Sequence, residues 1–402
     1  MEDILLKFNP WWDKTYEFPG IERDEYLAKL EPLLGLRDVL LITGLRRVGK
    51  TTIMHQLIHR LLQNVSPRNI LYISLDYLPL RDRTILEIEE AFRKVNSLKF
   101  NEKVFLFFDE VHFHNDYELQ LKNLYDLGFS KVVASGSANL DIVMRSPYLT
   151  GRQRLVRINP LSFNEFMRFR GLHVSRVDRH LLPSIALDYV ETGGLPEYVL
   201  RKDPNVLQTL IDTILYRDIS DRNNIRNREN VKNILMMIAQ SVSTPLSVNR
   251  ISRVLKIRNE IVSKIIDLLI EANLIHIAER TGKFAERKAS PNKYYLADTG
   301  LFSVLTERIN LGAKVENSVF LTLKRQDIVR YSKTSNEEVD FIIGTDAFEA
   351  KYKREITEKD LTPIRNLRGP TSRTIITENT EDIHKNIRLM PLWKFFQERE
   401  IL

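Results

Sequence analysis

The octapeptide Gly44–Thr51 constrains the fold of this chain more than any other segment. It has glycine at its first and sixth positions and ends in Gly-Lys-Thr, which fits the pattern G-x-x-x-x-G-K-[ST]. The apolar run Val39–Ile42 precedes it, and residues 52–58 favour a helix. A strand, a glycine-bearing loop and a helix in this order let backbone N–H groups converge on one anion. The octapeptide therefore predicts a phosphate-binding loop.

The side chains of this loop have roles that match ATP or ADP as ligand. Lys50 can reach the β- and γ-phosphates, and the Thr51 hydroxyl can ligate Mg²⁺. The residues expected to contact the nucleotide are Gly44, Arg46, Arg47, Val48, Gly49, Lys50, Thr51 and Thr52.

A second nucleotide signature lies further along the chain, where an apolar run ends in Asp109-Glu110. Asp109 is expected to hold Mg²⁺ directly or through water, and Glu110 to orient and deprotonate the attacking water. His112 and His114 follow closely. Two histidines without further clustered ligands are more typical of packing or surface positions than of a metal site.

Polar residues also follow the next apolar run, Lys131–Ser135. Ser135 or Ser137 can contact the γ-phosphate or the water, although Ser and Gly in this position are equally typical of an ordinary turn. Arg152 is a candidate catalytic residue, with Arg154 beside it, because an arginine can stabilise charge on the transferring phosphate. A solvated loop arginine is the alternative at both positions.

The first third of the chain alternates apolar runs with helical patterns. The runs are short and do not alternate polar with apolar residues, which is typical of parallel strands covered on both faces. They are Val39–Ile42, Ile70–Leu75, Val104–Phe108 and Lys131–Ser135, with helices expected at Ile85–Asn96 and Tyr117–Leu127. This pattern predicts a doubly wound α/β domain.

The rest of the chain is expected to divide into further domains. Residues 229–300 show three helical segments followed by two strands around a Gly- and Lys-rich tip at Thr281–Asn292, which predicts a winged helix. The predicted parts are an irregular N-terminal arm at 1–30, a P-loop ATPase domain at 31–175, a helical lid at 176–228, the winged helix at 229–300 and a mixed α/β domain at 301–402.

Positive charge concentrates in one part of the chain. The net charge is +7, and residues 229–293 hold 11 Lys or Arg against 6 Asp or Glu. Such an excess is typical of a surface that faces phosphates, or of a solvated helical face. The expected DNA contacts on the recognition helix and the wing are Arg258, Asn259, Lys264, Lys283, Arg287 and Lys288. The alternative is that this fold packs on the ATPase domain as a lid.

Carboxylates in the last quarter of the chain form a second constellation. Asp340 lies in an apolar strand, and Glu349 and Lys351 follow in the next strand, where they share one face. Together with Glu316 on a preceding helix, these carboxylates can bind Mg²⁺, while Lys351 can position a water. The alternatives are an inactive fold of the same kind and an exposed Glu-x-Lys pair on a surface strand.

The composition of the chain indicates where in the cell the protein is expected. The chain has 402 residues, is 43% hydrophobic and contains no cysteine. It has no apolar run long enough to cross a membrane, and the acidic start Met1-Glu2-Asp3 does not favour a signal peptide. These features predict a cytoplasmic protein without disulfides or cysteine-based zinc sites.

The motifs together resemble archaeal and bacterial AAA+-type ATPases of the STAND-related branch. The matching segments are Gly44–Thr52, Asp109-Glu110, Ser135–Ser137, Gly151-Arg152, Pro160–Phe166 and Gly193–Tyr198. In such proteins the proline of the last segment, here Pro196, lies against the nucleotide and reports its state. The resemblance implies a nucleotide-gated switch more than a motor.

The C-terminal constellation is similar to the PD-(D/E)xK nuclease superfamily, except that Glu338-Val339 stands where a proline often precedes the aspartate. The two resemblances imply an α/β protein with a P-loop sheet and helical lid, followed by winged-helix and restriction-endonuclease-like domains. The function expected is an ATPase that couples nucleotide state to DNA binding, with metal-dependent DNA processing as a further activity. The alternative is a non-nucleolytic, ATP-gated regulator that docks protein partners, and a homo-oligomer is compatible with either.

Overall fold

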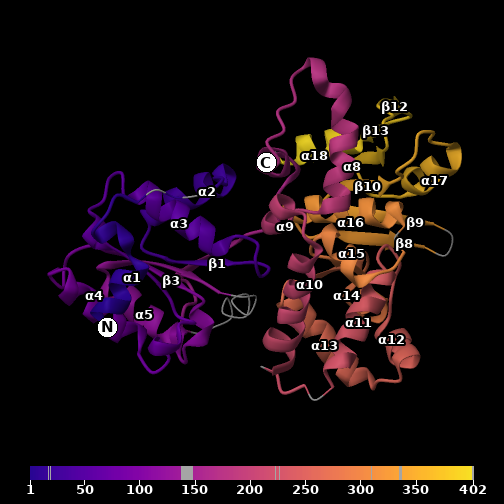
Figure 1. Cartoon of the computed structure of the whole chain (residues 1–402). Helices are drawn as coiled ribbons and strands as arrows, with labels where there is room; N and C mark the ends of the chain where they lie inside the picture. The colour runs from indigo at the N-terminus through magenta and orange to yellow at the C-terminus, as the bar shows by residue number, and fades with distance from the viewer. Residues whose placement is uncertain are drawn as a thin grey trace. The chain divides into compact units, whose positions relative to one another are not determined.

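The computed structural model describes the chain except for residues 17, 19, 137–147, 222, 226, 309, 335, 336, 401 and 402. The chain forms two compact units, Met1–Ile158 and Asn159–Leu402, each described by itself (Figure 1). The finer division expected at residues 175, 228 and 300 stays a prediction.

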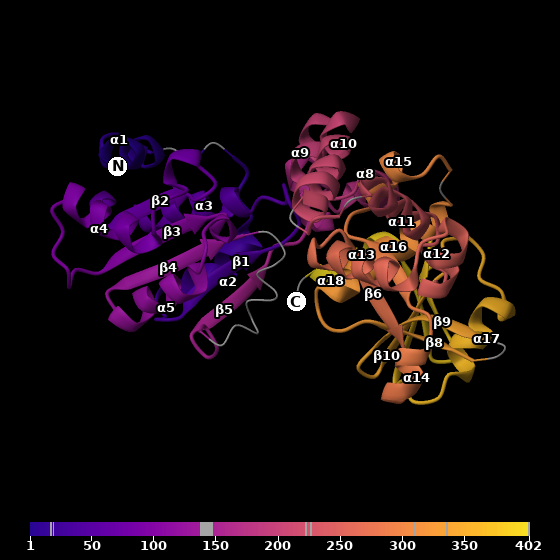
Figure 2. The same cartoon turned by 90° about the horizontal axis from the view of Figure 1, so that it is seen from below.

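The first unit is built on a five-stranded parallel sheet. Its strands lie in the order β2-β3-β4-β1-β5 (Figure 2). Their bounds are β1 (Val39–Thr43), β2 (Ile70–Ser74), β3 (Val104–Asp109), β4 (Ser130–Ser135) and β5 (Gln153–Arg157). Every residue of β1 and β3 is buried, as expected for unalternating apolar strands covered on both faces. The parallel α/β sheet expected from the sequence is therefore confirmed, with β5 as an additional strand.

Helices cover this sheet. One core cluster joins alternate strand residues to apolar side chains of α1, α4 and α5, and α2 contacts α3. Helix α4 begins with a capping box between Thr84 and Glu87, and α5 ends at Gly128 in the left-handed conformation. The helices are α1 (Glu2–Phe8), α2 (Asp24–Leu34), α3 (Lys50–Leu61), α4 (Ile85–Val95) and α5 (Tyr117–Leu127). Short 3₁₀ turns are η1 (Pro10–Trp12), η2 (Pro67–Asn69), η3 (Leu78–Leu80) and η4 (Val111–Phe113).

The expectation of an irregular arm over residues 1–30 is wrong. This segment forms α1, η1 and the start of α2, and it closes the edge strand β2. The Asn9 side chain accepts from Tyr72 N at 2.7 Å and donates to Tyr72 O at 2.9 Å, as a neighbouring strand would. The indoles of Trp11 and Trp12 donate to Ile70 O at 3.2 and 3.0 Å. Side chains thus replace a strand partner at an otherwise open edge.

The second unit contains an eight-stranded mixed sheet in the order β12-β13-β11-β10-β9-β8-β6-β7. Strands β10, β11 and β13 run parallel, whereas β9 is antiparallel to both β8 and β10. The bounds are β6 (Ile275–Arg280), β7 (Lys293–Leu296), β8 (Arg330–Lys333), β9 (Glu338–Ile343), β10 (Asp346–Ala350), β11 (Ser372–Thr377), β12 (Asp382–His384) and β13 (Ile387–Pro391).

Helices surround this sheet, with α11–α13 toward one end of the unit and β12 and β13 toward the other (Figure 1). The α-helices are α7 (Phe163–Phe169), α8 (Leu182–Thr192), α9 (Pro196–Arg201), α10 (Pro204–Asp212), α11 (Arg228–Gln240), α12 (Val248–Leu255), α13 (Asn259–Glu271), α14 (Phe284–Ala289), α15 (Phe302–Leu305), α16 (Leu311–Lys324), α17 (Glu358–Asn366) and α18 (Leu392–Glu400). The remaining helical segments are 3₁₀ turns η5 (Val177–Leu181) and η7 (Thr299–Leu301) and the π-helix η6 (Thr213–Asp221).

Residues 229–300 contain the elements expected of a winged helix, in the expected order: α11, α12, α13 and the antiparallel hairpin β6–β7. The tip differs from the expectation, because α14 occupies the Gly- and Lys-rich segment. Glu286 accepts from Lys283 N at 3.2 Å and so starts this short helix. The hairpin also continues into the C-terminal sheet, since β6 pairs in parallel with β8. The assignment of this segment as a winged-helix domain stays a prediction.

Candidate functional site

The loop between β1 and α3 has the backbone conformations that a phosphate cradle requires. Gly44 has φ +145° and Gly49 has φ +99°, both in the region that favours glycine. A Cβ at Gly44 would collide with the backbone oxygen of Ile158, so this position accepts only glycine. Arg47 also has positive φ, at +60°. Gly49 directly precedes α3, so the loop leads into a helix N-terminus, where anions are favoured.

Lys50 lies inside this loop and is only 6% exposed. Its Nζ donates to the backbone oxygens of Gly44 at 3.1 Å and Leu45 at 3.3 Å. The ammonium is therefore held at the centre of the loop by carbonyls that a phosphate oxygen can replace. Arg23, from the N-terminal segment, stabilises the loop by donating to Val48 O at 3.2 Å. Sequence reasoning missed Arg23 because the segment was taken as irregular.

Asp109, at the end of β3, receives hydrogen bonds from three neighbouring elements. Thr51 Oγ1 on α3 donates to Asp109 Oδ2 at 2.5 Å, and Ser135 Oγ on β4 donates to Asp109 Oδ1. Tyr72 on β2 donates its hydroxyl to Asp109 Oδ2 at 3.0 Å. The carboxylate is 2% exposed. The structure thus brings Thr51, Asp109 and Ser135 together, as expected, because the carboxyl ends of parallel strands meet at one edge.

Tyr72 is a site residue that sequence reasoning missed. Burial and then Asp109 raise the pKa of its hydroxyl, so it stays a hydrogen-bond donor at neutral pH. His55 of α3 packs against the Tyr72 ring with a centroid distance of 4.3 Å. The available signal was a tyrosine between aliphatic residues at the centre of a strand, which is a position where the hydroxyl needs a buried partner.

Thr51 and Asp109 fit a magnesium ion bound together with a nucleotide. A hydroxyl and a carboxylate 2.5 Å apart offer two of the oxygen ligands that Mg²⁺ prefers, with phosphates and waters supplying the others. Among the described residues, no three His, Asp or Glu side chains form a group that could hold a metal ion. The ion would therefore depend on the nucleotide, which is usual for phosphate-linked magnesium.

Glu110 has the left-handed conformation, with φ +55°, which is uncommon for a non-glycine residue. Its backbone N–H donates to Ser135 Oγ at 3.3 Å, and its Oε2 lies 3.2 Å from His112 Nδ1. Burial raises the pKa of the Glu110 carboxyl, and the Lys50 ammonium opposes that rise. A carboxylate with a raised pKa beside a phosphate loop suits a group that accepts a proton from water.

The two arginines proposed to stabilise charge lie near the start of β1, whereas the phosphate loop follows the end of that strand. Arg152 O accepts from Val39 N at 2.8 Å, which places Arg152 beside the first residue of β1. Its guanidinium lies 3.5 Å from Asp126, and Arg154 pairs with Asp38 at 2.6 Å. The phosphate loop follows the last residue of β1, and a five-residue strand spans more than ~10 Å. Arg152 therefore lies away from the phosphate loop of its own chain, and its catalytic role stays a prediction.

Two other candidates are not placed in this site. Ser137 lies outside the described residues. Pro196 opens α9 in the second unit, after the turn Gly193-Gly194, where Gly194 N donates to Asp298 Oδ2 at 2.6 Å. Its contact with a nucleotide stays a prediction.

The structure brings the residues of the C-terminal constellation together, and their binding of metal stays a prediction. Asp340 N donates to Glu349 Oε2 at 3.0 Å, Lys351 Nζ lies 2.6 Å from Glu349 Oε1, and Glu316 lies in the same cluster. Sequence reasoning missed Lys293, whose Nζ is 3.1 Å from Asp340 Oδ1. A lysine at the start of a short strand of aromatic and aliphatic residues was the available signal, because a buried ammonium requires carboxylate partners.

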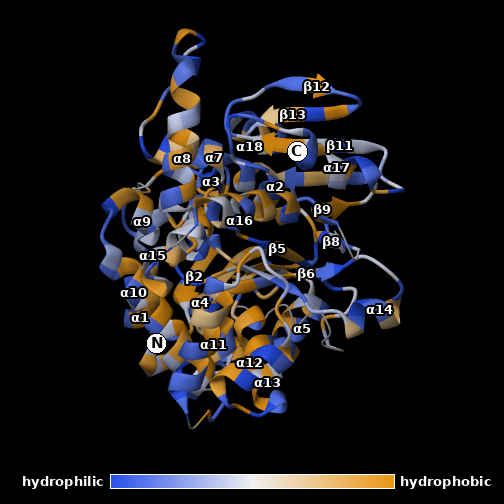
Figure 3. Cartoon of the chain, turned by 90° about the vertical axis from the view of Figure 1, so that its right-hand side faces the viewer, coloured by the Kyte–Doolittle hydropathy of each residue, from blue (hydrophilic) through white to orange (hydrophobic). Residues whose placement is uncertain are grey.

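The expected DNA contacts lie mostly on the surface. On α12 and α13, hydrophobic and hydrophilic segments alternate (Figure 3), and Arg258, Asn259 and Lys264 are exposed. Lys264 lines a cavity of about 390 Å³ together with the asparagines at 223, 224, 227 and 230. At the tip, Lys283 and Lys288 are exposed and Arg287 is half-buried.

The tip cations are partly neutralised. Lys288 pairs with Glu279 at 3.0 Å, and Arg287 lies 3.9 Å from the same carboxylate. The tip therefore presents less positive charge than its sequence suggests.

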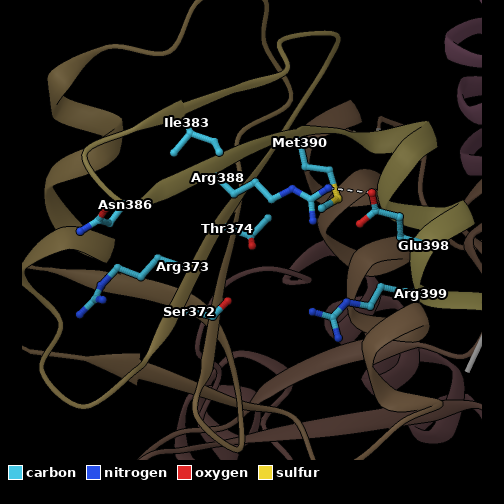
Figure 4. Close-up of a pocket in the computed structure, with 9 residues that line it drawn as sticks. All are labelled: Ser372, Arg373, Thr374, Ile383, Asn386, Arg388, Met390, Glu398 and Arg399. Atoms are coloured by element: carbon cyan, nitrogen blue, oxygen red, sulfur yellow. Dashed lines mark hydrogen bonds and ion pairs between the residues drawn. The ribbon is translucent and has the colours of Figure 1, made fainter.

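A further cavity of about 500 Å³ lies at the other end of the second unit, lined by β11–β13 and α18 (Figure 4). Arg388 pairs there with Glu398 at 2.7 Å, as the dashed line shows. Arg373 donates to the backbone oxygens of Ile364 and Leu367, both at 2.9 Å. The guanidiniums that line this cavity are thus engaged in holding the fold.

Comparison with known proteins identifies the nucleotide-binding part. Residues 36–167 match the model of an AAA domain, and residues 185–313 match a domain of unknown function, DUF8612. The match covers the loop, Asp109 and Ser135, so this part of the chain is similar to an AAA domain. None of the helices in the described residues is long and apolar enough to cross a membrane.

Relatives of similar length exist in an archaeon and a bacterium. Uncharacterized protein MJ1544 of Methanocaldococcus jannaschii is 27% identical over 393 residues, covering 89% of this chain and 88% of that protein. An uncharacterized protein of Haemophilus influenzae is 28% identical over 344 residues, covering 80% of this chain and 83% of that protein.

Two solved structures align with the chain at low scores. The Saccharomyces cerevisiae Hsp104:casein complex gives a TM-score of 0.32 at 18% identity over 56% of this chain, which spans 46% of the Hsp104 chain. AMPPCP-bound DnaA from Aquifex aeolicus gives 0.28 at 16% identity, over 67% of this chain and 92% of that one. Both scores are too low to establish a common fold.

Proposed function

We propose that this protein binds and hydrolyses ATP and acts as an AAA+-type switch whose nucleotide state controls DNA binding by the second unit. The observation that carries the ATPase part is the convergence of Thr51, Tyr72 and Ser135 on Asp109 beside the loop that holds Lys50. Three elements of the fold, α3, β2 and β4, each donate a hydrogen bond there to one buried carboxylate at the end of β3. A loop with only a structural role would not require polar groups to converge on a buried carboxylate.

The residues of the loop would bind and orient the triphosphate. Lys50 would exchange the oxygens of Gly44 and Leu45 for phosphate oxygens, and the α3 N-terminus would favour the negative charge. Magnesium bound with the nucleotide would neutralise charge on the phosphates. Thr51 and Asp109 would hold that ion.

Glu110 would act on water. Glu110 directly follows Asp109 in the sequence, and its backbone N–H donates a hydrogen bond to Ser135 Oγ. In this position it would orient a water and take its proton, while Ser135 would hold Asp109 and Glu110 in register. Arg152 and Arg154 lie near the start of β1, away from the phosphate loop, so fast turnover would require charge from another arginine.

The DNA part of the proposal is supported by the exposed cations at the start of α13. The structure favours a non-nucleolytic version, since Lys293 lies among the carboxylates of the C-terminal constellation. A non-nucleolytic regulator that docks protein partners is the second candidate, and the same observation favours it. A cytoplasmic location stays a prediction.

The ATPase part is tested by turnover of the full chain with ATP and Mg²⁺. Glu110→Gln should retain ATP and lose about 10²- to 10⁴-fold in rate, the usual contribution of a general base. Glu90→Gln, an exposed change on α4, is the matched control and should hydrolyse ATP as the wild type does. Equal rates for wild type and Glu110→Gln would remove the proposed role of Glu110.

A further inference from the structure

One buried ammonium lies at the centre of the C-terminal carboxylates. Lys293 is the first residue of β7 and its side chain is fully buried. Its Nζ lies 2.8 Å from Glu338 Oε1, 3.1 Å from Asp340 Oδ1 and 3.3 Å from Glu316 Oε1. These carboxylates come from β9 and α16, two different elements of the unit. The lysine therefore bridges parts of the fold that the chain brings together from a distance.

Each N–H donor of the Lys293 ammonium has a carboxylate partner available. An ammonium has three N–H donors and no acceptor, and here three carboxylate oxygens surround it at 2.8 to 3.3 Å. The Tyr331 ring adds a cation–π contact, with its centroid 5.6 Å from Nζ. A divalent metal uses the same oxygens at about 2.0–2.6 Å. Ammonium and metal cannot share this position, because they compete for the same ligands and repel each other.

Further hydrogen bonds and ion pairs within the chain engage other oxygens of the cluster. Asp340 Oδ2 accepts from Ala350 N at 3.1 Å, and Glu349 Oε2 accepts from Asp340 N at 3.0 Å. Glu349 Oε1 pairs with Lys351 at 2.6 Å. Tyr295 donates its hydroxyl to Glu316 Oε1 at 2.8 Å. Asp340 and Glu349, which a nuclease of this type would use as metal ligands, thus have all four oxygens engaged.

The charge balance of the cluster also argues against a bound divalent metal. The carboxylates of Glu316, Glu338, Asp340 and Glu349 face the ammoniums of Lys293 and Lys351, and Lys333 also pairs with Glu338 at 2.7 Å. A cluster so close to neutral has little electrostatic need for a divalent ion.

We propose that Lys293 is the resident cation of this cluster, in the place where a PD-(D/E)xK-type nuclease would hold its metal. The constellation is then a metal-independent ion-pair joint that fastens the β6–β7 hairpin to α16 and to β9 of the C-terminal sheet. The second unit neither binds Mg²⁺ or Mn²⁺ at these carboxylates nor cuts DNA through them. This inference does not depend on ATP binding by the first unit.

The first experiment measures Mn²⁺ binding to the full chain by electron paramagnetic resonance, without nucleotide. Every protein carries Asp109→Asn, so that the ATPase site does not contribute. The parent and the parent with Asp340→Asn should bind the same number of ions, whereas the parent with Lys293→Met should gain one. Adding Asp340→Asn to Lys293→Met should remove that gain. A site in the parent that Asp340→Asn abolishes would overturn the proposal.

A second measurement needs no variant at Lys293, which can impair folding. Wild-type protein is treated with an amine-acetylating reagent, with and without millimolar Mn²⁺, and lysine acetylation is read by mass spectrometry. Lys283 and Lys288, which are exposed, should react in both conditions. Lys293 should stay protected in both. Reaction of Lys293 on adding Mn²⁺ would show that a metal displaces it, which contradicts the proposal.

Discussion

At the scale of single residues, the candidate nucleotide site depends on how Asp109 is held. A carboxylate that is 2% exposed is costly to bury unless hydrogen bonds compensate it, and here Thr51, Tyr72 and Ser135 donate to it. Thr51 also belongs to the loop, so the carboxylate couples the loop to the strands beside it. Tyr72 has no place in either sequence signature, yet it orients the group expected to bind magnesium.

Tyr72→Phe tests that orienting role. The change removes one hydrogen bond to Asp109 and keeps the ring, so the fold should persist. Loss of a partner behind a metal ligand typically costs about 10- to 100-fold in metal affinity. We expect the Mg²⁺ concentration for half-maximal ATPase activity to rise by about 10-fold, while ATP affinity changes little. Tyr77→Phe, a more exposed tyrosine, is the control and should leave both unchanged. An unaltered Mg²⁺ dependence in Tyr72→Phe would refute the role.

At the scale of elements, the turn before α9 is fixed by a buried carboxylate that is distant from it in the sequence. Asp298, which is 1% exposed, accepts from Gly300 N at 2.8 Å and from Gly194 N at 2.6 Å. A Cβ at Gly193 or Gly300 would overlap the Asp298 side chain, so glycine is required at both positions. The Gly193-Gly194 turn that the sequence singled out for a role near nucleotide therefore also has a packing role within its own unit.

This arrangement predicts a pH dependence. Burial raises the pKa of Asp298 from 3.8 to about 6, so the folded chain keeps a proton there that the unfolded chain releases. The carboxyl's contribution to the free energy of unfolding therefore falls as pH rises from about 4 to 6, by up to about 3 kcal/mol. Urea unfolding of the wild type and of Asp298→Asn should show a stability difference that shrinks over this range. Glu307→Gln, an exposed change, should show a constant difference. A pH-independent difference for Asp298→Asn would contradict the assignment.

At the scale of the whole molecule, the sequence predicted the first unit well and the second less well. The octapeptide and the strands at Val104 and Lys131 were found because local patterns define them. Closure of edge strand β2 by Asn9 was missed, because a side chain imitating a strand partner has no sequence pattern. The position of Arg152 could not be predicted, because only the register of β5 against β1 shows which end of the sheet it occupies. Lys293 was missed because its partners lie in separate elements.

DNA binding by the second unit is the whole-molecule property still to be measured. If Arg258 and Lys264 contact phosphates, the affinity of the full chain for duplex DNA should fall steeply with salt. Each alanine substitution should then lower the slope of log affinity against log salt by about one. Lys359→Ala on α17, an exposed lysine elsewhere in the unit, should not alter the slope. A flat salt response in the wild type would favour the regulator that docks protein partners.

The claim on which the whole account depends is that a nucleoside triphosphate binds in the loop between β1 and α3. Calorimetric titration of the full chain with ATP and Mg²⁺ tests it most directly. We predict one bound nucleotide per chain, and an affinity about 10- to 100-fold weaker in Lys50→Ala, since a charge-assisted hydrogen bond is lost. Lys94→Ala, an exposed change on α4, should bind as the wild type does. Absence of heat in the wild type, or unchanged affinity in Lys50→Ala, would contradict the account.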